Sequence, residues 1–311
     1  MKSIIGVSLI SLVLGWAVTG TIPPATITPD EATLKYFPPE TQGIVFIDVA
    51  ALRSAPLVQD VLSKGQFTLP KGLNDLEENT GFDLRRDVDR VTMGKINPRE
   101  KLVVADARYE KFKTEQFLKD KGRQVETYLG RAIYRDGDAA TSFLDNVIFF
   151  GTENAVKGAI DRITYPGSAQ IGSDLLDAIR TVEAGNQVWA VGNFSQEDLP
   201  ATKLRESMPA AQILKSLRHG TYQMRVDRDL HARATGNFSD ADTAGNLADM
   251  ARGFIAVAKL QVAKQQPDLL HLLDGIEVSN NGSALMVRIE EPGDLLLKLQ
   301  ETRPKFGRHV Q

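Results

Sequence analysis

The sequence contains no cysteine. This absence excludes disulfides, thiolate metal sites, iron–sulfur clusters and a cysteine nucleophile. It also excludes a lipid anchor attached to a cysteine near the N-terminus. Histidine is scarce as well, because the chain has only four, and no two of them lie three to five residues apart. No helix face can therefore carry the histidine pair typical of a zinc site, and we predict no metal.

An excess of positive charge is also lacking. The chain has 37 basic and 40 acidic residues, which gives a formal net charge of −3. A protein that binds nucleic acid needs a basic face that replaces the counterions of the phosphates. We therefore expect no nucleic-acid partner.

The motifs that mark common catalytic and nucleotide sites are absent from the sequence. There is no Gly-x-Ser-x-Gly elbow for a serine nucleophile, no phosphate-binding loop and no dinucleotide-binding glycine triplet. Asp136 and Asp138 flank Gly137, but the residues that follow do not supply the alternating ligands of a calcium loop, so a hairpin turn is the better interpretation. We predict no cofactor and no catalytic residue from sequence motifs.

The N-terminal segment, residues 1–22, has the composition of an export signal. Lys2 is followed by an apolar run from Ile4 to Val18 and then by small residues. If this segment is not cleaved, residues 4–22 are about long enough to cross a bilayer, which takes about 20 apolar residues. The proline-rich residues 23–29 that follow are predicted to be a linker. We expect an exported protein, periplasmic or extracellular, that contacts a membrane only through an uncleaved N-terminal segment.

The pattern of apolar residues predicts an α+β fold built from two similar units. The first unit covers residues 30–172 and the second covers residues 173–303, followed by a flexible tail at 304–311. Each unit contains the order strand, helix, strand, strand, helix, strand, which is the order of ferredoxin-like folds. We therefore predict an internal duplication, with antiparallel sheets covered by helices.

The tetrapeptide Gly-Asn-Phe-Ser occurs twice, each time between an apolar and an acidic stretch. Ser195 is followed by Asp198, and Ser239 by Asp242, at the spacing of a capping box. The serine oxygen accepts a backbone N–H at the start of a helix, and the acid favours the positive end of the helix dipole. We predict that these four residues are structural helix caps.

Two other stretches are interpreted as structural. The run Phe82 to Arg90 alternates arginine with aspartate, which predicts paired surface charge. A long helix is expected over Asp240 to Lys264, where apolar residues and many alanines recur at spacings of three and four. Such a helix packs on a core, or it covers an apolar cavity in a protein that carries an apolar ligand.

Three segments together resemble uncharacterised exported bacterial proteins of the acidobacterial type. The segments are YFPPETQGIVFIDVAALRSAPLVQDVL, LEENTGFDLRRDVDRV and AIDRITYPGSAQIGSDLLDAIRTVEAGNQVWAVGNF. The resemblance covers most of the chain from Asp30 to Leu299. It implies export and a repeated α+β build, and it attaches no activity, cofactor or site residue.

Three hypotheses about function remain open from the sequence. The first is a non-catalytic interaction or binding module of the envelope, with an unknown protein as partner. The second is a periplasmic carrier or sensor of an apolar ligand. The third is an enzyme whose acids, such as Asp106 or Asp145, come together only in the fold.

The export hypothesis predicts where the protein is found and how its mature chain begins. Cell fractionation followed by N-terminal sequencing should find the protein outside the cytoplasm. The mature chain should begin after Gly20, or the intact chain should remain in the membrane fraction. A protein that begins at Met1 in the cytosolic fraction would contradict export.

Overall fold

A computed structural model describes residues 31–63, 71–165, 167, 171–193, 217–262 and 267–302. The predicted signal segment, the linker and the C-terminal tail lie outside these ranges. Among the helices that the structure describes, none combines the length and the apolar character needed to cross a membrane.

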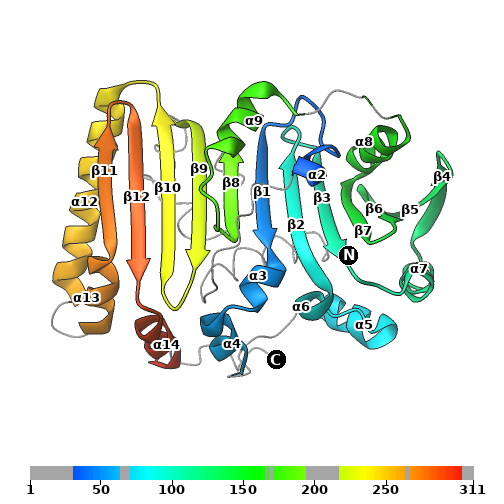
Figure 1. Cartoon of the computed structure of the whole chain (residues 1–311), viewed down its shortest axis with the longest axis horizontal. Helices are drawn as coiled ribbons and strands as arrows, with labels where there is room; N and C mark the ends of the chain where they lie inside the picture. Colours follow the sequence, from blue (N-terminus) through cyan, green and yellow to red (C-terminus); the bar gives the residue numbers. More distant parts are fainter. Residues whose placement is uncertain are drawn as a thin grey trace.

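The described strands form a single twelve-stranded antiparallel sheet (Figure 1). Its order is β11-β12-β10-β9-β8-β1-β2-β3-β7-β6-β5-β4. The strands are β1 (Gly43–Asp48), β2 (Val88–Lys95), β3 (Lys101–Ala107), β4 (Gln124–Tyr128), β5 (Arg131–Asp136), β6 (Ala139–Leu144), β7 (Val147–Thr152), β8 (Val188–Gly192), β9 (Leu217–Val226), β10 (Leu230–Phe238), β11 (Ile276–Asn281) and β12 (Ala284–Glu291).

Helices connect the strands and lie on both faces of the sheet (Figure 1). The helices of the first half are α2 (Glu31–Leu34), α3 (Val49–Arg53), α4 (Pro56–Ser63), α5 (Lys71–Thr80), α6 (Leu84–Asp87), α7 (Lys111–Asp120) and α8 (Glu153–Thr164). Those of the second half are α9 (Ser173–Arg180), α12 (Ala241–Val262), α13 (Pro267–Asp274) and α14 (Gly293–Thr302).

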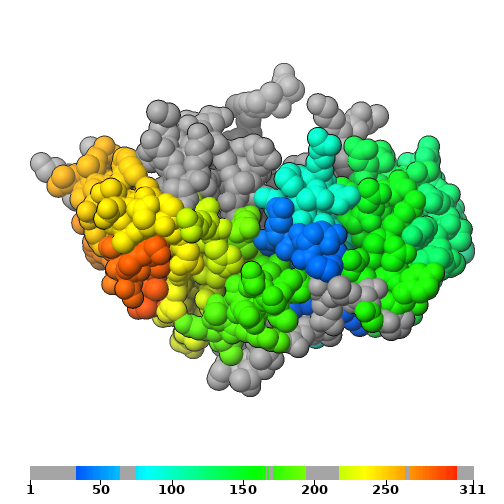
Figure 2. All heavy atoms as spheres, turned by 90° about the horizontal axis from the view of Figure 1, so that it is seen from above, coloured from blue at the N-terminus to red at the C-terminus, as the bar shows by residue number. Residues whose placement is uncertain are grey.

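The two halves of the chain meet where β1 pairs with β8. The pairing is antiparallel and runs from Gly43 opposite Gly192 to Ile47 opposite Val188. The sequence therefore forms one sheet instead of the separate sheets we expected. Seen from above, residues of the second half lie at one end in orange and yellow, and green residues of the first half lie at the other (Figure 2).

The strand order also departs from the ferredoxin-like unit that the sequence predicted. A split βαβ unit keeps another strand between its first two strands, which run parallel. Here β1 pairs directly and antiparallel with β2, and β8 does the same with β9. The order of elements along the chain was compatible with both arrangements, because it does not determine which strands share hydrogen bonds.

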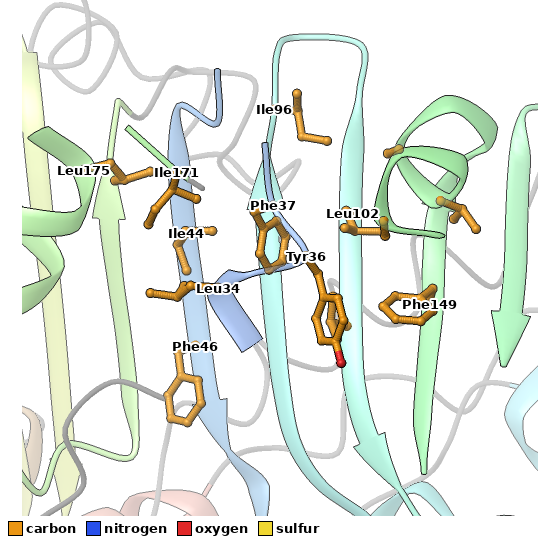
Figure 3. Close-up of a cluster of buried hydrophobic side chains, with 14 of the residues drawn as sticks. Leu34, Tyr36, Phe37, Ile44, Phe46, Ile96, Leu102, Phe149, Ile171 and Leu175 are labelled. Atoms are coloured by element: carbon orange, nitrogen blue, oxygen red, sulfur yellow. The ribbon is translucent and has the colours of Figure 1, made fainter. Parts of the chain in front are cut away.

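We name the two faces of the sheet after the helices that cover them. The α9 face holds the first core, in which residues of α2, α8 and α9 pack on the central strands (Figure 3). Phe46 and Trp189 stack across the junction of the halves with ring centroids 5.4 Å apart. The residues labelled in Figure 3 are Leu34, Tyr36, Phe37, Ile44, Phe46, Ile96, Leu102, Phe149, Ile171 and Leu175.

The opposite face, the α12 face, holds two further cores. One contains Ile47, Val91 and Met224 from strands of both halves, together with Leu52 and Phe82. The other lies under the first turns of α12 and contains Phe238, Ala244, Leu247, Ala248 and Leu285. Side chains alternate between the faces of a strand, so each half contributes apolar residues to both sides of the sheet.

Gln187 extends the hydrogen-bond ladder beside the junction of the halves. Its side-chain amide donates to Val226 O at 3.0 Å and accepts from Val226 N at 2.8 Å. Its backbone oxygen accepts from Asp48 N at 2.7 Å. The buried Gln187 therefore joins β1 and β9 just before β8 begins.

Two local elements differ from the sequence-based expectations. The apolar run Ser142 to Gly151 has the pattern of one strand, but it contains parts of β6 and β7 and turns at Asp145, which has a φ of +47°. The residues on both sides of this turn are apolar, so the pattern of apolar residues does not mark it. Helix α13, between α12 and β11, was not predicted.

The close approach of β1 and β8 predicts that replacing two different glycines with alanine has opposite effects on stability. Gly192 has a φ of +141°, and a Cβ there would lie 2.3 Å from Gly43 Cα and 2.4 Å from Gln42 O. Gly192→Ala should therefore lower the free energy of unfolding by about 2 kcal/mol or more, measured by urea denaturation.

Gly253→Ala is the matched control. Gly253 lies inside α12, and apart from its chain neighbours and the backbone of the helix itself, no described atom comes within 4 Å of a Cβ placed there. This change should raise the free energy of unfolding by about 0.5 to 1 kcal/mol. Equal effects at the two glycines would show that the close approach of β1 and β8 does not constrain the fold.

Candidate functional site

Beyond β8, the α9 face changes from apolar to polar. Here residues of β9, β10 and β12 and of the segment between α9 and β8 surround a hollow of about 150 Å³. The residues that line it are Glu183, Ala184, Asn186, Gln223, Arg225, His231, Ala232, Arg233, Arg288 and Glu290. We call this the polar hollow. It is the candidate functional site because it gathers charged side chains from segments far apart in the chain.

Strand register arranges the polar side chains in two rows. In the first row Arg225, His231 and Glu290 lie opposite one another on β9, β10 and β12. The second row, two residues further along each strand, contains Gln223, Arg233 and Arg288. Gln223 pairs with Trp189 of β8, so both rows continue the face on which α9 packs.

The segment between α9 and β8 forms one wall of the hollow and is fixed to β9. Gln223 Oε1 accepts the backbone N–H of Glu183 at 2.8 Å and Asn186 Nδ2 at 3.1 Å. Glu183 also forms an ion pair with Arg233. The wall is therefore held by a side-chain amide and by a charged pair.

The other polar pair of the hollow joins β10 to β12. His231 Nδ1 lies 2.7 Å from Glu290 Oε2. Both side chains are partly solvent-exposed, so this contact resembles the charge pairs of protein surfaces. Glu183 and Glu290 thus each contact a basic residue of the hollow.

The arginines of the hollow are not all neutralised by these acids. Within the described chain, no hydrogen bond or ion pair joins Arg225 or Arg288 to another side chain, and the buried Nε of Arg233 has no partner. Glu277 of β11 lies opposite Arg288 in register, without an ion pair between them. Among the described residues, the guanidinium groups of Arg225 and Arg288 therefore have no side-chain partner that would compete with a ligand.

Of the two helix caps predicted from the sequence, the structure describes only the second. Ser195 and Asp198 lie outside the described residues. At the second copy, α12 begins at Ala241, and Asp240 Oδ1 accepts the backbone N–H of Thr243 at 2.7 Å. Ser239 Oγ donates to Asp240 Oδ2 at 2.7 Å, so Asp240, and not Ser239, caps the helix. Asp242 lies in the first turn.

Asp106 and Asp145, the acids suggested for an enzyme, lie in the same region but do not form a buried pair. Asp106 is on β3 opposite Val147 and pairs with Arg90 at 3.9 Å. Asp145 is an exposed residue of the turn between β6 and β7. Asp136 and Asp138 flank the hairpin turn between β5 and β6, as predicted.

The alternating charges from Phe82 to Arg90 are extensively paired. Arg85 contacts Asp83 at 2.8 Å and Glu77 at 2.9 Å. Arg86 contacts Asp87 at 2.7 Å, and this hydrogen bond holds the pKa of Asp87 below its usual value. The segment joins α5, α6 and β2 and gives no indication of a ligand site.

Histidine and acidic side chains do not gather into a metal site. In the ranges covered by the structure, no group of three or more such residues could hold a metal ion. His219 is partly buried, and burial lowers its pKa. His309 lies outside the described residues.

Glu291 of β12 is a buried acid on the α12 face, opposite the face that carries the polar hollow. The sequence did not predict it. The residue is 3% exposed, and neither carboxylate oxygen has a hydrogen-bond partner among the described residues. Close packing explains the burial, since a Cβ on Gly275 would lie 2.3 Å from Glu291 Oε1. Burial, with a smaller contribution from Asp274, raises the pKa of Glu291 to about 7.

Two other surfaces have features of a binding site. A hollow between α5 and α7 is lined by Asn79, Phe112, Lys113, Gln116, Phe117, Asp120 and Lys121. On α12, Phe254, Val257 and Leu260 are 55%, 53% and 79% exposed. Neither surface gathers polar side chains from as many separate strands as the polar hollow does.

Sequence comparisons give no relative for this chain. No family model matches it, and no curated protein matches it. The resemblance to exported bacterial proteins therefore stays a prediction.

Among solved structures, the chain is similar in fold to TP0453. The structure of crystal form III of TP0453 gives a TM-score of 0.54 at 10% identity, over 91% of this chain and 99% of that chain. Crystal forms I and IV each give a TM-score of 0.47 at 10% identity, over 86% and 92% of this chain and 96% and 99% of the other. Similarity to crystal form III at this identity shows a shared α+β fold and carries no information about function.

Glu291 makes stability depend on pH in a defined direction. The folded protein holds this proton more tightly than the unfolded chain, whose carboxyl has the usual value of 4.5. The free energy of unfolding should therefore fall as the pH rises from about 4.5 to 7, by about 3 kcal/mol, and then level off. Glu291→Gln should remove this part of the pH dependence in urea denaturation.

Glu277→Gln, at an exposed position on β11, controls for the loss of one carboxyl. The comparison uses the change in unfolding free energy between pH 5 and pH 8, because a buried glutamine can alter stability equally at both values. An E291Q protein with the same pH dependence as the unmodified chain would show that Glu291 is not a buried acid.

Proposed function

We propose that the protein is a non-catalytic binding module of the bacterial envelope, and that the polar hollow is its binding surface. The observation that carries this proposal is the set of three arginines, Arg225, Arg233 and Arg288, on neighbouring strands of one sheet face. Export, inferred from the N-terminal sequence, would place this surface outside the cytoplasm.

The fold does not require the polar residues of this face. β9, β10 and β12 already pack their alternate side chains, such as Met224, Ala232 and Leu285, into the cores of the α12 face. A sheet face that is not needed for the core usually carries scattered, mutually paired polar residues. Three arginines and two acids line the hollow, and Glu277 beside it forms no ion pair with Arg288. This gathering of guanidinium groups is better explained by the recognition of a ligand.

The acids of the hollow support binding over catalysis. Glu183 pairs with Arg233, and Glu290 contacts His231, so each carboxylate has a basic neighbour. General acid–base catalysis by two carboxyl groups uses environments that separate their pKa values. The described geometry instead places each acid against one basic side chain, Arg233 or His231, and not against the other acid.

We also propose that the two halves arose by duplication of a shorter unit. Each half begins with a strand at the junction, β1 or β8, and continues with a hairpin, β2–β3 or β9–β10. In each half a second hairpin, β6–β7 or β11–β12, then pairs with the first one. In the first half β7 pairs with β3, and in the second half β12 pairs with β10. The first half extends further with β4 and β5.

A carrier of apolar ligands is the second candidate function. It is favoured by Phe254, Val257 and Leu260, which α12 exposes at spacings of three. Under the first turns of the same helix, Ala244, Ala248 and Leu285 are packed together. The apolar surface therefore lies on the outside of α12 rather than between this helix and the sheet.

Site-specific photo-crosslinking in intact cells tests both candidates. A photoreactive amino acid replaces Thr235, on the polar face of β10, Val257, on the outside of α12, or Lys119, an exposed control on α7. The binding-module proposal predicts covalent adducts at Thr235 and none at Lys119. Adducts only at Val257 would favour the carrier, and equal labelling at all three positions would contradict a specific binding face.

A further inference from the structure

The charge balance of the polar hollow identifies the kind of ligand that it suits. Arg225, Arg233 and Arg288 bring three positive charges, whereas Glu183 and Glu290 bring two negative charges. The side chains that line the hollow therefore carry one more positive than negative charge, within a chain whose formal net charge is −3. Glu277 of β11 lies opposite Arg288 at the edge of the hollow but forms no ion pair with it.

Strand pairing places like charges next to each other. Arg233 and Arg288 lie directly opposite on β10 and β12, where neighbouring strands are about 5 Å apart. Like charges in directly opposite positions destabilise a sheet. Glu183 balances Arg233, but the guanidinium of Arg288 has no ion pair with any described residue. An anion between these side chains would relieve the repulsion.

Arginine also determines which anions fit. Its planar guanidinium presents parallel N–H groups that match the two oxygens of a carboxylate or a phosphate. Arg225 and Arg288 are on the strands that flank β10, so they approach the hollow from opposite sides. Two guanidinium groups on opposite sides suit a ligand with two negative charges.

The size and rigidity of the hollow restrict the ligand further. Its volume of about 150 Å³ is below the range of about 300 to 1,000 Å³ that is usual for drug-sized ligands. Gln223 fixes the wall at Glu183 and Asn186 through two hydrogen bonds, of 2.8 and 3.1 Å. A wall held in this way reduces the entropy that is lost when a ligand binds.

We propose that the polar hollow binds a small dianion, either a phosphate group or a short dicarboxylate, held between Arg225 and Arg288 above Arg233. This inference rests on the proposed function and names the ligand class of the same surface. Both kinds of ligand offer the paired oxygens that the guanidinium groups recognise. Glu183 keeps Arg233 in position, and Gln223 keeps the wall in place.

Isothermal titration calorimetry of the full chain tests this proposal. The protein is titrated at low ionic strength with inorganic phosphate, with succinate, and with acetate as a monoanion control. Phosphate or succinate should bind at least about tenfold more tightly than acetate, which corresponds to the loss of about one charged hydrogen bond. The comparison of phosphate with succinate identifies which oxyanion is preferred.

Substitutions locate the binding to the hollow. Arg225→Gln and Arg288→Gln should each weaken binding of the preferred dianion about tenfold or more. Arg218→Gln, at an exposed position on β9 that does not line the hollow, should leave the affinity unchanged. If Arg288→Gln does not fold, Arg288→Lys keeps the charge but removes the forked geometry, and it should also weaken binding.

The outcomes separate this inference from the proposed function. Equal binding by the R225Q, R288Q and R218Q proteins, or dianion binding no tighter than that of acetate, overturns the dianion proposal. If adducts at Thr235 nevertheless form in cells, the face still binds a partner and only the ligand class is wrong. If neither dianions bind nor adducts form at Thr235, the proposed function fails as well.

Discussion

The pairing of β1 with β8 is the contact on which the rest of the structure depends. It brings Gly43 and Gly192 so close that a single Cβ would collide with backbone, and it merges the strands of both halves into one sheet. Gln187 continues the same ladder toward Val226. Because Phe46 and Trp189 stack across this junction, the core of the first half extends into the second without a break.

The position of the polar hollow follows from this junction. Residues of helix α9 and Trp189 of β8 belong to the same apolar core, and the residue opposite Trp189 on β9 is the polar Gln223. Gln223 fixes the segment that follows α9, so the structure that ends the apolar core also builds a wall of the hollow. The apolar and polar parts of the α9 face are thus adjacent parts of one surface, and they meet between β8 and β9.

The sequence predicted most elements but not their partners. Apolar runs such as Gly43 to Val49 identified strands, because burial leaves a local pattern. The turn at Asp145 was missed between two apolar runs, and the cap of α12 was assigned one residue early, to Ser239 instead of Asp240. The charged hollow could not be predicted, since Arg225 and Arg288 lie on strands distant in the chain. Its one sequence signal is the alternation of charged residues in each strand.

The same alternation explains how these strands can serve both stability and binding. Glu290 and Glu291 are neighbours in β12, yet Glu290 faces the hollow beside His231, whereas Glu291 is buried with no hydrogen-bond partner among the described residues. Cores on the α12 face already stabilise β9, β10 and β12, so residues on their opposite face can repel one another without unfolding the sheet. The fold can therefore maintain neighbouring arginines in a fixed geometry, which isolated strands could not do.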